Sequence, residues 1–167
     1  MLEAAARFLE ARPRSVQEVR RRLTTAGYRP ELVDAAIGRL GELGYLDDDA
    51  FARTWVESRD RARPRGEHAL RRELRLKGVD DSIIRSVLDD RRQGGPDDPD
   101  NADAPERMDV DRAAADRLLA RHARSLDRVA DVRVRRQRAY ALLVRNGFDP
   151  STAGDVARRF IDDSPDQ

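Results

Sequence analysis

The chain of 167 residues contains no cysteine, so it can form neither disulfide bonds nor thiolate metal sites. Aromatic residues make up only 5%, and no apolar run approaches the roughly 20 residues that a membrane-spanning helix needs. The first ten residues include acidic side chains, whereas a secretory signal peptide begins with basic ones. We therefore expect a cytoplasmic protein.

Charged residues are abundant, at 39%, and they are segregated along the chain although the net charge is only +1. Residues 93–111 contain seven acidic residues and one arginine, whereas residues 112–161 contain 12 arginines and five acidic residues. Three more aspartates lie in the last six residues. A basic C-terminal segment between two acidic ones can attract an anionic surface, or the acidic segments can fold back on it.

A helical unit with a glycine in its turn recurs three times. The glycines are Gly27, Gly78 and Gly147, and they are 51 and 69 residues apart. Apolar residues at positions −8 and −4 precede each of them, and these residues are Val19 and Leu23, Leu70 and Leu74, and Ala139 and Leu143. Spacing of this kind is typical of helices with one apolar stripe, and the unequal intervals indicate an imperfect array with one insertion.

The fold class that we predict is all-α, an elongated tandem array of three three-helix repeats. The repeats span residues 1–46, 47–92 and 109–162, with a disordered, acidic, Pro- and Gly-rich linker over 93–108 and a disordered tail over 163–167. Each repeat has only about 45 residues, which bury too little apolar surface to fold alone, so neighbouring repeats are expected to support one another.

Several helix starts carry recognisable signals. After a first helix over Leu2–Ala11, Ser15 and Glu18 have the spacing of a capping box. Pro30 suits the first turn of the next helix, whose predicted core stripe is Leu32, Val33, Ala36, Ile37 and Leu40. The carboxylates of Asp47, Asp48 and Asp49 suit a helix N-terminus, as do Asp149 and Pro150 in the third repeat.

Basic residues cluster on the helices that precede the repeated glycines. They are Arg20, Arg21 and Arg22 in the first repeat, and Arg71, Arg72, Arg75 and Lys77 in the second. Arg20 is equivalent to Arg71, and Arg21 is equivalent to Arg72. The third repeat instead places Arg133, Arg135, Arg136 and Arg138 at the helix start. These are our candidate partner-binding residues; the alternative is that i, i+4 pairs such as Glu67 with Arg71 merely solvate a helix face.

Other features favour structural roles. Phe51, Ala52, Trp55 and Val56 share a helix face, with Arg59 one turn further on, and core packing is the favoured interpretation of this face. Helix capping explains the Asp47–Asp49 cluster better than a metal site with Asp80 and Asp81, because the spaced ligands of a calcium loop are missing. His68 and His122 have no second ligand at metal spacing. We expect no metal, no cofactor and no enzymatic activity.

A helix, a glycine turn and a second helix also form the DNA-binding helix-turn-helix motif. In this chain the helices after the glycines start with acidic residues, among them Glu31, Asp34, Asp80 and Asp81. A recognition helix needs basic or polar residues there, so sequence-specific DNA recognition is the less favoured interpretation.

Residues 43–48, Leu-Gly-Tyr-Leu-Asp-Asp, are followed by Phe51-Ala52, Trp55, Arg59 and Gly66, and then by residues 71–79, Arg-Arg-Glu-Leu-Arg-Leu-Lys-Gly-Val. This pattern resembles the central signature of RecX, the bacterial regulator of RecA, and Gly147-Phe148 in the third repeat matches less specifically. The resemblance covers nearly the whole chain, although the linker over residues 93–107 is longer and more acidic than is usual in the family.

The resemblance implies a monomeric, non-enzymatic protein that binds RecA and lies in the groove of its DNA filament. It further implies that the protein modulates, and mainly inhibits, the recombinase in DNA repair by homologous recombination and in the SOS response. The rival hypothesis is a nonspecific helical DNA-binding protein whose arginines neutralise phosphates.

Overall fold

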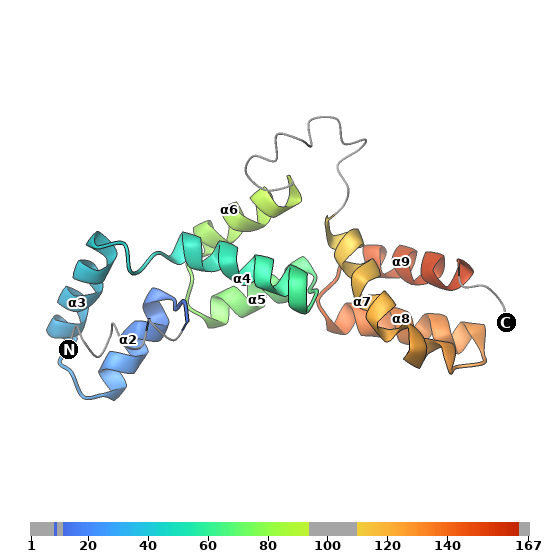
Figure 1. The fold of residues 1–167 in the computed structure, drawn as a ribbon, viewed down its shortest axis with the longest axis horizontal. Helices are drawn as coiled ribbons and strands as arrows, with labels where there is room; N and C mark the ends of the chain where they lie inside the picture. Colours follow the sequence, from blue (N-terminus) through green and yellow to red (C-terminus); the bar gives the residue numbers. More distant parts are fainter. Residues whose placement is uncertain (1–8, 10–11, 94–109, 164–167) are drawn as a thin grey trace. The chain divides into compact units, whose positions relative to one another are not determined.

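The computed structural model describes Leu9, residues 12–93 and residues 110–163, and this part of the chain contains eight helices and no strand (Figure 1). The helices are α2 (Val16–Thr25), α3 (Pro30–Glu42), α4 (Asp48–Ala62), α5 (Glu67–Leu76), α6 (Asp81–Arg92), α7 (Val110–Asp127), α8 (Val132–Arg145) and α9 (Pro150–Asp162). The predicted all-α repeat fold is confirmed. The helix expected over Leu2–Ala11, the linker expected over 93–108 and most of the expected tail lie outside the described residues.

The chain forms two compact units, and each is considered by itself. The first unit consists of Met1–Trp55 and Glu73–Val87, and the second consists of Val56–Arg72 and Leu88–Gln167. Helices α4, α5 and α6 therefore contribute residues to both units. None of the described helices is long and apolar enough to cross a bilayer.

The three aligned glycines end α2, α5 and α8 in the same way. Gly27, Gly78 and Gly147 have φ angles of 85°, 78° and 84°, a left-handed conformation that only glycine adopts without strain. The amide of the next residue donates to the carbonyl oxygen five residues back in all three turns, as in Phe148 to Leu143 at 3.3 Å. This is the hydrogen bond of a Schellman motif, which explains why the repeats align on glycine.

The helix starts follow the sequence signals closely. The Ser15 hydroxyl accepts from the Glu18 amide at 3.2 Å, and Glu18 accepts from the Ser15 amide at 3.3 Å, which confirms the capping box. Asp131 caps α8 and Asp149 caps α9, where Pro150 takes the first position. Each cap satisfies an amide that the first helical turn leaves without a partner.

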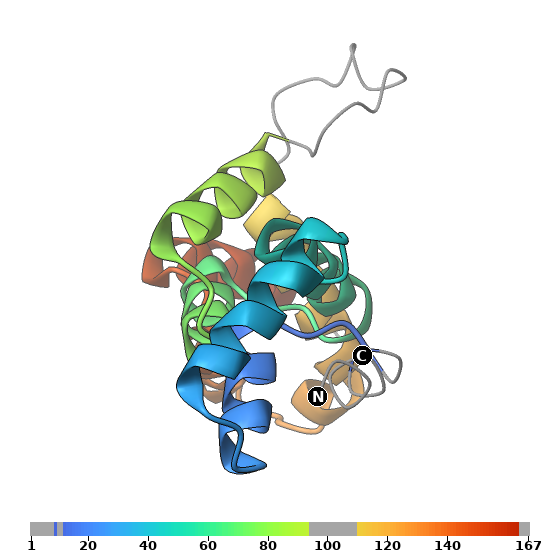
Figure 2. The ribbon, with the colours of Figure 1, turned by 90° about the vertical axis from the view of Figure 1, so that its left-hand side faces the viewer.

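The first unit buries the apolar stripes of α2 and α3, the two helices that face the viewer in Figure 2. The core consists of Val19, Leu23, Val33, Ala36, Leu40 and Leu46. Leu32, which the sequence pattern placed in the core stripe, is 41% exposed. It lies one position before Val33, about 100° around α3, and with Val33 at the centre of the buried face the side chain of Leu32 falls at the edge of that face.

The second unit holds the core of the third repeat, built from α7, α8 and α9. Its buried side chains are Ala114, Ala115, Leu118, Leu119, Leu126, Ala139, Leu143, Phe148, Ala153, Val156 and Ala157, with Leu142 and Phe160 partly buried against them. Phe148, the residue after the third glycine, is 1% exposed and is one of the largest fully buried side chains. The turn at Gly147 therefore also places the Phe148 ring in the core of the third repeat.

Within the first unit, the start of α2 contacts the glycine turn of the second repeat through what we call the first joint, formed by Ser15, Val16, Asp48 and Lys77. The Ser15 hydroxyl donates to the Lys77 carbonyl oxygen at 2.6 Å, and the Val16 amide donates to the Asp48 carboxylate at 2.9 Å. The next residue of the turn, Gly78, lies so close to Gln17 that a Cβ on Gly78 would overlap the Gln17 side chain.

Within the second unit, the start of α5 contacts the glycine turn of the third repeat in the same manner. This second joint is formed by Gly66, Glu67, Asp111 and Asn146. The Gly66 amide donates to the Asn146 carbonyl oxygen at 3.1 Å, and the Glu67 amide donates to the Asp111 carboxylate at 3.1 Å. His68 adds a hydrogen bond from its amide to the Gly147 carbonyl oxygen at 3.2 Å.

The two joints correspond residue by residue. Ser15 and Gly66 hold the same position before their helices, and Lys77 and Asn146 each precede a repeated glycine. In both joints an aspartate at the start of the next repeat's first helix accepts an amide of the preceding repeat. The amide–aspartate contact is therefore built twice from the repeated sequence, whereas the contact to the glycine turn uses the Ser15 hydroxyl in the first joint and the Gly66 amide in the second.

Candidate partner-binding arginines

On α2, the three candidate arginines differ in what they contact. Arg20 forms an ion pair with Asp34 of α3. Arg21 is exposed and forms no ion pair with any described residue. Arg22 is also exposed, but it takes part in an interaction within the chain. Arg21 is therefore the side chain of the three that is most available to a partner.

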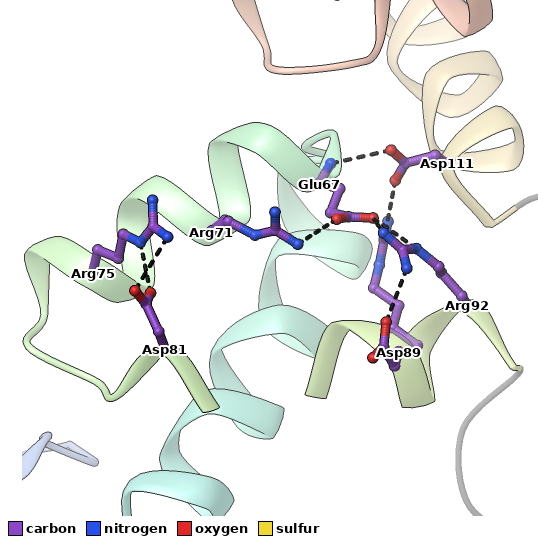
Figure 3. A network of polar contacts seen from close by, with 8 residues as sticks. Glu67, Arg71, Arg75, Asp81, Asp89, Arg92 and Asp111 are labelled. Carbon is purple, nitrogen blue, oxygen red and sulfur yellow. Dashed lines mark hydrogen bonds and ion pairs between the residues drawn. The ribbon is translucent and has the colours of Figure 1, made fainter. Parts of the chain in front are cut away.

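The equivalent residues on α5 divide in the same way. Arg71 pairs with Glu67 at 2.7 Å, as the i, i+4 spacing predicted (Figure 3). Arg75 meets the Asp81 carboxylate with two nitrogens, at 2.7 and 3.2 Å. Arg72 is exposed and makes no ion pair within the described part of the chain. At the position shared by Arg21 and Arg72 the positive charge is thus available to a partner. At the position shared by Arg20 and Arg71 it is paired with a carboxylate of the chain.

Lys77 belongs to the first joint, and its side chain contacts other residues of the chain. Its ammonium group pairs with Glu18 at 2.8 Å and lies 4.9 Å from the centre of the Trp55 ring, a cation–π contact. The Trp55 indole N–H donates to Glu73 at 3.0 Å. Trp55 is half-buried, whereas Phe51 beside it is 5% exposed. The predicted packing role holds fully for Phe51, and for Trp55 it is shared with a polar network.

Glu18 connects the capping box to the first joint, and its titration follows from that position. Burial alone raises the pKa of Glu18, but the hydrogen bond from Lys77, the Ser15 amide and the charges of Lys77 and Arg12 outweigh burial and leave the pKa lowered. A carboxylate with a lowered pKa stabilises the fold above its unfolded-state pKa, and this stabilisation is lost as the pH falls through the folded-state value.

We expect Glu18→Gln to lower the free energy of unfolding at pH 7 by about 1 kcal/mol, because it removes a charge-assisted hydrogen bond. The difference from the parent should shrink as the pH falls below about 4.3, where the unfolded state of the parent takes up a proton, and it should vanish once the folded-state carboxyl of Glu18 is protonated too. Urea unfolding at several pH values measures this. Glu31→Gln, at an exposed site of α3, is the matched control and should change stability by less than about 0.5 kcal/mol. A pH-independent deficit in Glu18→Gln would contradict the assignment.

The aspartates of the signature have separate tasks. Asp47 accepts the amides of Asp49 and Ala50 at 2.9 and 3.0 Å and so caps α4. Asp48 accepts the Val16 amide in the first joint. Burial raises the pKa of Asp48 and outweighs the lowering by the Val16 amide, with a further increase from the Asp47 charge. Capping, as predicted, explains Asp47; contact with the preceding repeat explains Asp48.

Arg59 of the signature is half-buried on α4 and takes part in an interaction within the chain. On α8, Arg135 donates to the Val129 carbonyl oxygen at 3.0 Å and Arg136 pairs with Asp162 at 3.2 Å. Arg133 and Arg138 are exposed and have no ion pair within residues 12–93 and 110–163. The third repeat therefore also combines arginines with internal partners and arginines directed to solvent.

Sequence reasoning missed one charged cluster altogether. Arg91 of α6 is 7% exposed, and it contacts the Asp60 carboxylate of α4 with two nitrogens, at 2.9 and 3.0 Å, and Asp111 of α7 at 2.6 Å. In the sequence, Arg91 stands in a run of charged residues that looks solvated. Its acidic partners are 31 and 20 residues away, so no local spacing could have revealed them.

The comparisons with known proteins agree with this architecture. A family model described as the second three-helix domain of RecX matches residues 47–88, and one described as the first three-helix domain of RecX matches residues 2–40. The chain is 38% identical over 150 residues to the regulatory protein RecX of Mycobacterium sp. strain JLS, which covers 90% of this chain and 75% of the relative. It is 39% identical over 152 residues to the regulatory protein RecX of Mycolicibacterium smegmatis, with 90% and 73% covered.

Solved structures share the fold at lower identity. The crystal structure of RecX from Lactobacillus salivarius gives a TM-score of 0.73 at 19% identity, over 96% of this chain and 94% of that one. A second crystal structure, of a regulatory protein RecX, gives 0.71 at 21% identity over 98% and 70%. Because the curated relatives exceed 30% identity over most of both chains, the chain belongs to the RecX family of regulatory proteins.

Proposed function

We propose that this RecX-family protein binds RecA and its DNA filament, and that it restrains recombination by occupying the filament rather than by catalysis. The observation that carries the proposal is the recurrence, at equivalent positions of two repeats, of an exposed arginine that forms no ion pair with the described residues; the two are Arg21 and Arg72. Solvation of a helix face does not require an available cation at the same place in both of these repeats.

The paired arginines help to define the binding residues. Arg20 and Arg71 form ion pairs with Asp34 and Glu67, and Lys77 forms one with Glu18. A partner that binds these basic side chains would have to displace the carboxylates. Arg21, Arg72, Arg133 and Arg138 meet a partner without that cost. Several modest contacts carried by one chain add through effective concentration, so no single arginine needs to bind tightly.

We expect the double replacement Arg21→Ala and Arg72→Ala to raise the protein concentration needed for half-inhibition of RecA-driven strand exchange by about tenfold, or about 1.4 kcal/mol, since arginine is enriched among the interface residues whose truncation costs most. Alanine favours helix and the sites are exposed, so circular dichroism should be unchanged. The matched control is Arg20→Ala with Arg71→Ala, which removes the same charge from adjacent positions of the same helices. Equal inhibition by the two double variants would reject the assignment of the exposed pair.

The second candidate function, nonspecific DNA binding, has the same arginines as its basis. It predicts that affinity for DNA alone falls steeply with salt, with a slope in log units of about −0.9 for each phosphate neutralised. It also predicts equal losses in both double variants, because only the removed charge matters. Binding of the parent to purified RecA without DNA separates the two functions, and an absence of such binding would favour this second candidate.

A further inference from the structure

Helix α8 differs in composition from the other described helices. Its 14 residues include five arginines and no aspartate or glutamate, whereas α2 to α7 and α9 each contain at least one carboxylate. Its buried side consists of Ala139 and Leu143, both fully buried in the third-repeat core. The rest of the helix surface is therefore cationic without internal neutralisation along its own length.

The same helix exposes an unusual amount of apolar surface. Of the eight large hydrophobic side chains that are exposed in the described part of the chain, four lie on α8: Val132 at 45%, Val134 at 36%, Tyr140 at 38% and Val144 at 38%. The other four are distributed over segments of the first two repeats. Scattered exposed apolar residues need no explanation, whereas exposed apolar neighbours that share one face, as Tyr140 and Val144 do at i, i+4, indicate an interaction surface.

The exposed residues are ordered along the helix. Arg133, Gln137, Tyr140 and Val144 follow one another at intervals of four, three and four residues, which places them on one face. We call this the α8 outer face. It continues sideways through Val134 and Arg138, at the same spacing of four. Charged and apolar side chains thus alternate over about three turns of α8.

This combination restricts the chemistry of the occupant. Valine side chains offer nothing to a phosphate, and their exposure on a purely DNA-neutralising helix would serve no contact. Tyrosine and arginine are the residue types that dominate protein interfaces, and an apolar centre with charges around it is the usual anatomy of such a patch. The absence of any carboxylate on α8 is complementary to a surface that presents aspartate or glutamate around apolar side chains.

We infer that the α8 outer face docks directly on protein, on an acidic surface with an apolar centre carried by the RecA protomer, and not on nucleic acid. This inference rests on the proposed function and deepens it, since it assigns protein contact to the third repeat through Tyr140 and Val144 as well as through Arg133 and Arg138. The apolar pair supplies buried area, and the arginines orient the complex and speed its formation.

The test uses the full-length chain and purified RecA without DNA. The replacements Tyr140→Ala and Val144→Ala together should weaken binding to RecA by about tenfold, and Arg133→Ala with Arg138→Ala should weaken it to a similar degree. The matched control removes exposed apolar side chains from the other repeats, Leu32→Ala with Leu76→Ala, at sites that are 41% and 72% exposed. The control should bind RecA like the parent.

A second measurement separates the alternatives. Binding of each variant to a fluorescein-labelled single-stranded oligonucleotide should be the same for the parent and for Tyr140→Ala with Val144→Ala. A loss of oligonucleotide binding in that variant would make the face a nucleic-acid platform and overturn the inference. Parental RecA binding by the variant would overturn it as well while leaving the proposed function intact. Failure of the parent itself to bind RecA would reject the proposed function.

Discussion

Gly66→Ala is expected to lower the free energy of unfolding by about 3 kcal/mol or more, at the upper end of what overpacking costs. A Cβ on Gly66 would lie far inside van der Waals contact with the Gly147 carbonyl oxygen and the Phe148 amide nitrogen. Both neighbours are backbone atoms of a tight turn, so no side chain can move aside. The second joint would have to open, and it would lose the hydrogen bonds from the Gly66 and His68 amides. Thermal or urea unfolding measures the loss.

Gly154→Ala is the matched control in the same unit. Gly154 lies in the interior of α9, and a Cβ there would meet nothing within 4 Å. Alanine should stabilise this helix by as much as about 1 kcal/mol, because glycine is the poorer helix former. If Gly66→Ala unfolds at the same urea concentration as the parent, the close approach of the two backbones does not persist in solution.

The repeat architecture was readable from the sequence because its signals are local. The left-handed turn at Gly27, the capping box of Ser15 and Glu18, and the proline start at Pro150 each depend on residues within a few positions. Such signals act through backbone hydrogen bonds of one helix end, and a window of four to six residues contains all of the participants. They predicted where helices begin and end, but not what each helix contacts.

The joints and the division of the arginines were not readable in this way. Gly66 looks like an ordinary turn residue in the sequence. Glycine is required there because the backbone of Gly147, 81 residues further on, occupies the space of a Cβ. The sequence pattern gave all the candidate arginines one interpretation, yet Arg20 has an intrachain partner and Arg21 has no ion pair among the described residues. Adjacent residues on a helix point about 100° apart, so which one meets a carboxylate depends on the neighbouring helix and not on spacing.

Arg91→Met is expected to cost about 3 kcal/mol, for the reason that makes buried ion pairs sensitive to the loss of one partner. Burial lowers the pKa of Arg91, but the hydrogen bonds to Asp60 and Asp111 outweigh burial and raise it, so the guanidinium stays charged. Methionine fills similar volume and leaves both carboxylates without their counter-charge, and these are only 21% and 17% exposed.

The neighbouring Arg92→Met is the matched control, with the same change of charge and volume one position later. Arg92 is 55% exposed and pairs with Glu67 and Asp89 at 2.5 and 2.9 Å, so solvent screens its contribution and the loss should be below about 1 kcal/mol (Figure 3). Unfolding in urea with and without 0.5 M NaCl distinguishes the two sites. Salt screens exposed charges, so it should reduce the loss of stability that Arg92→Met causes relative to the parent, and it should leave the loss caused by Arg91→Met nearly unchanged. Equal losses in the two variants would show that Arg91 is solvated in solution, and that its ion pairs with Asp60 and Asp111 contribute no more to stability than the exposed pairs of Arg92.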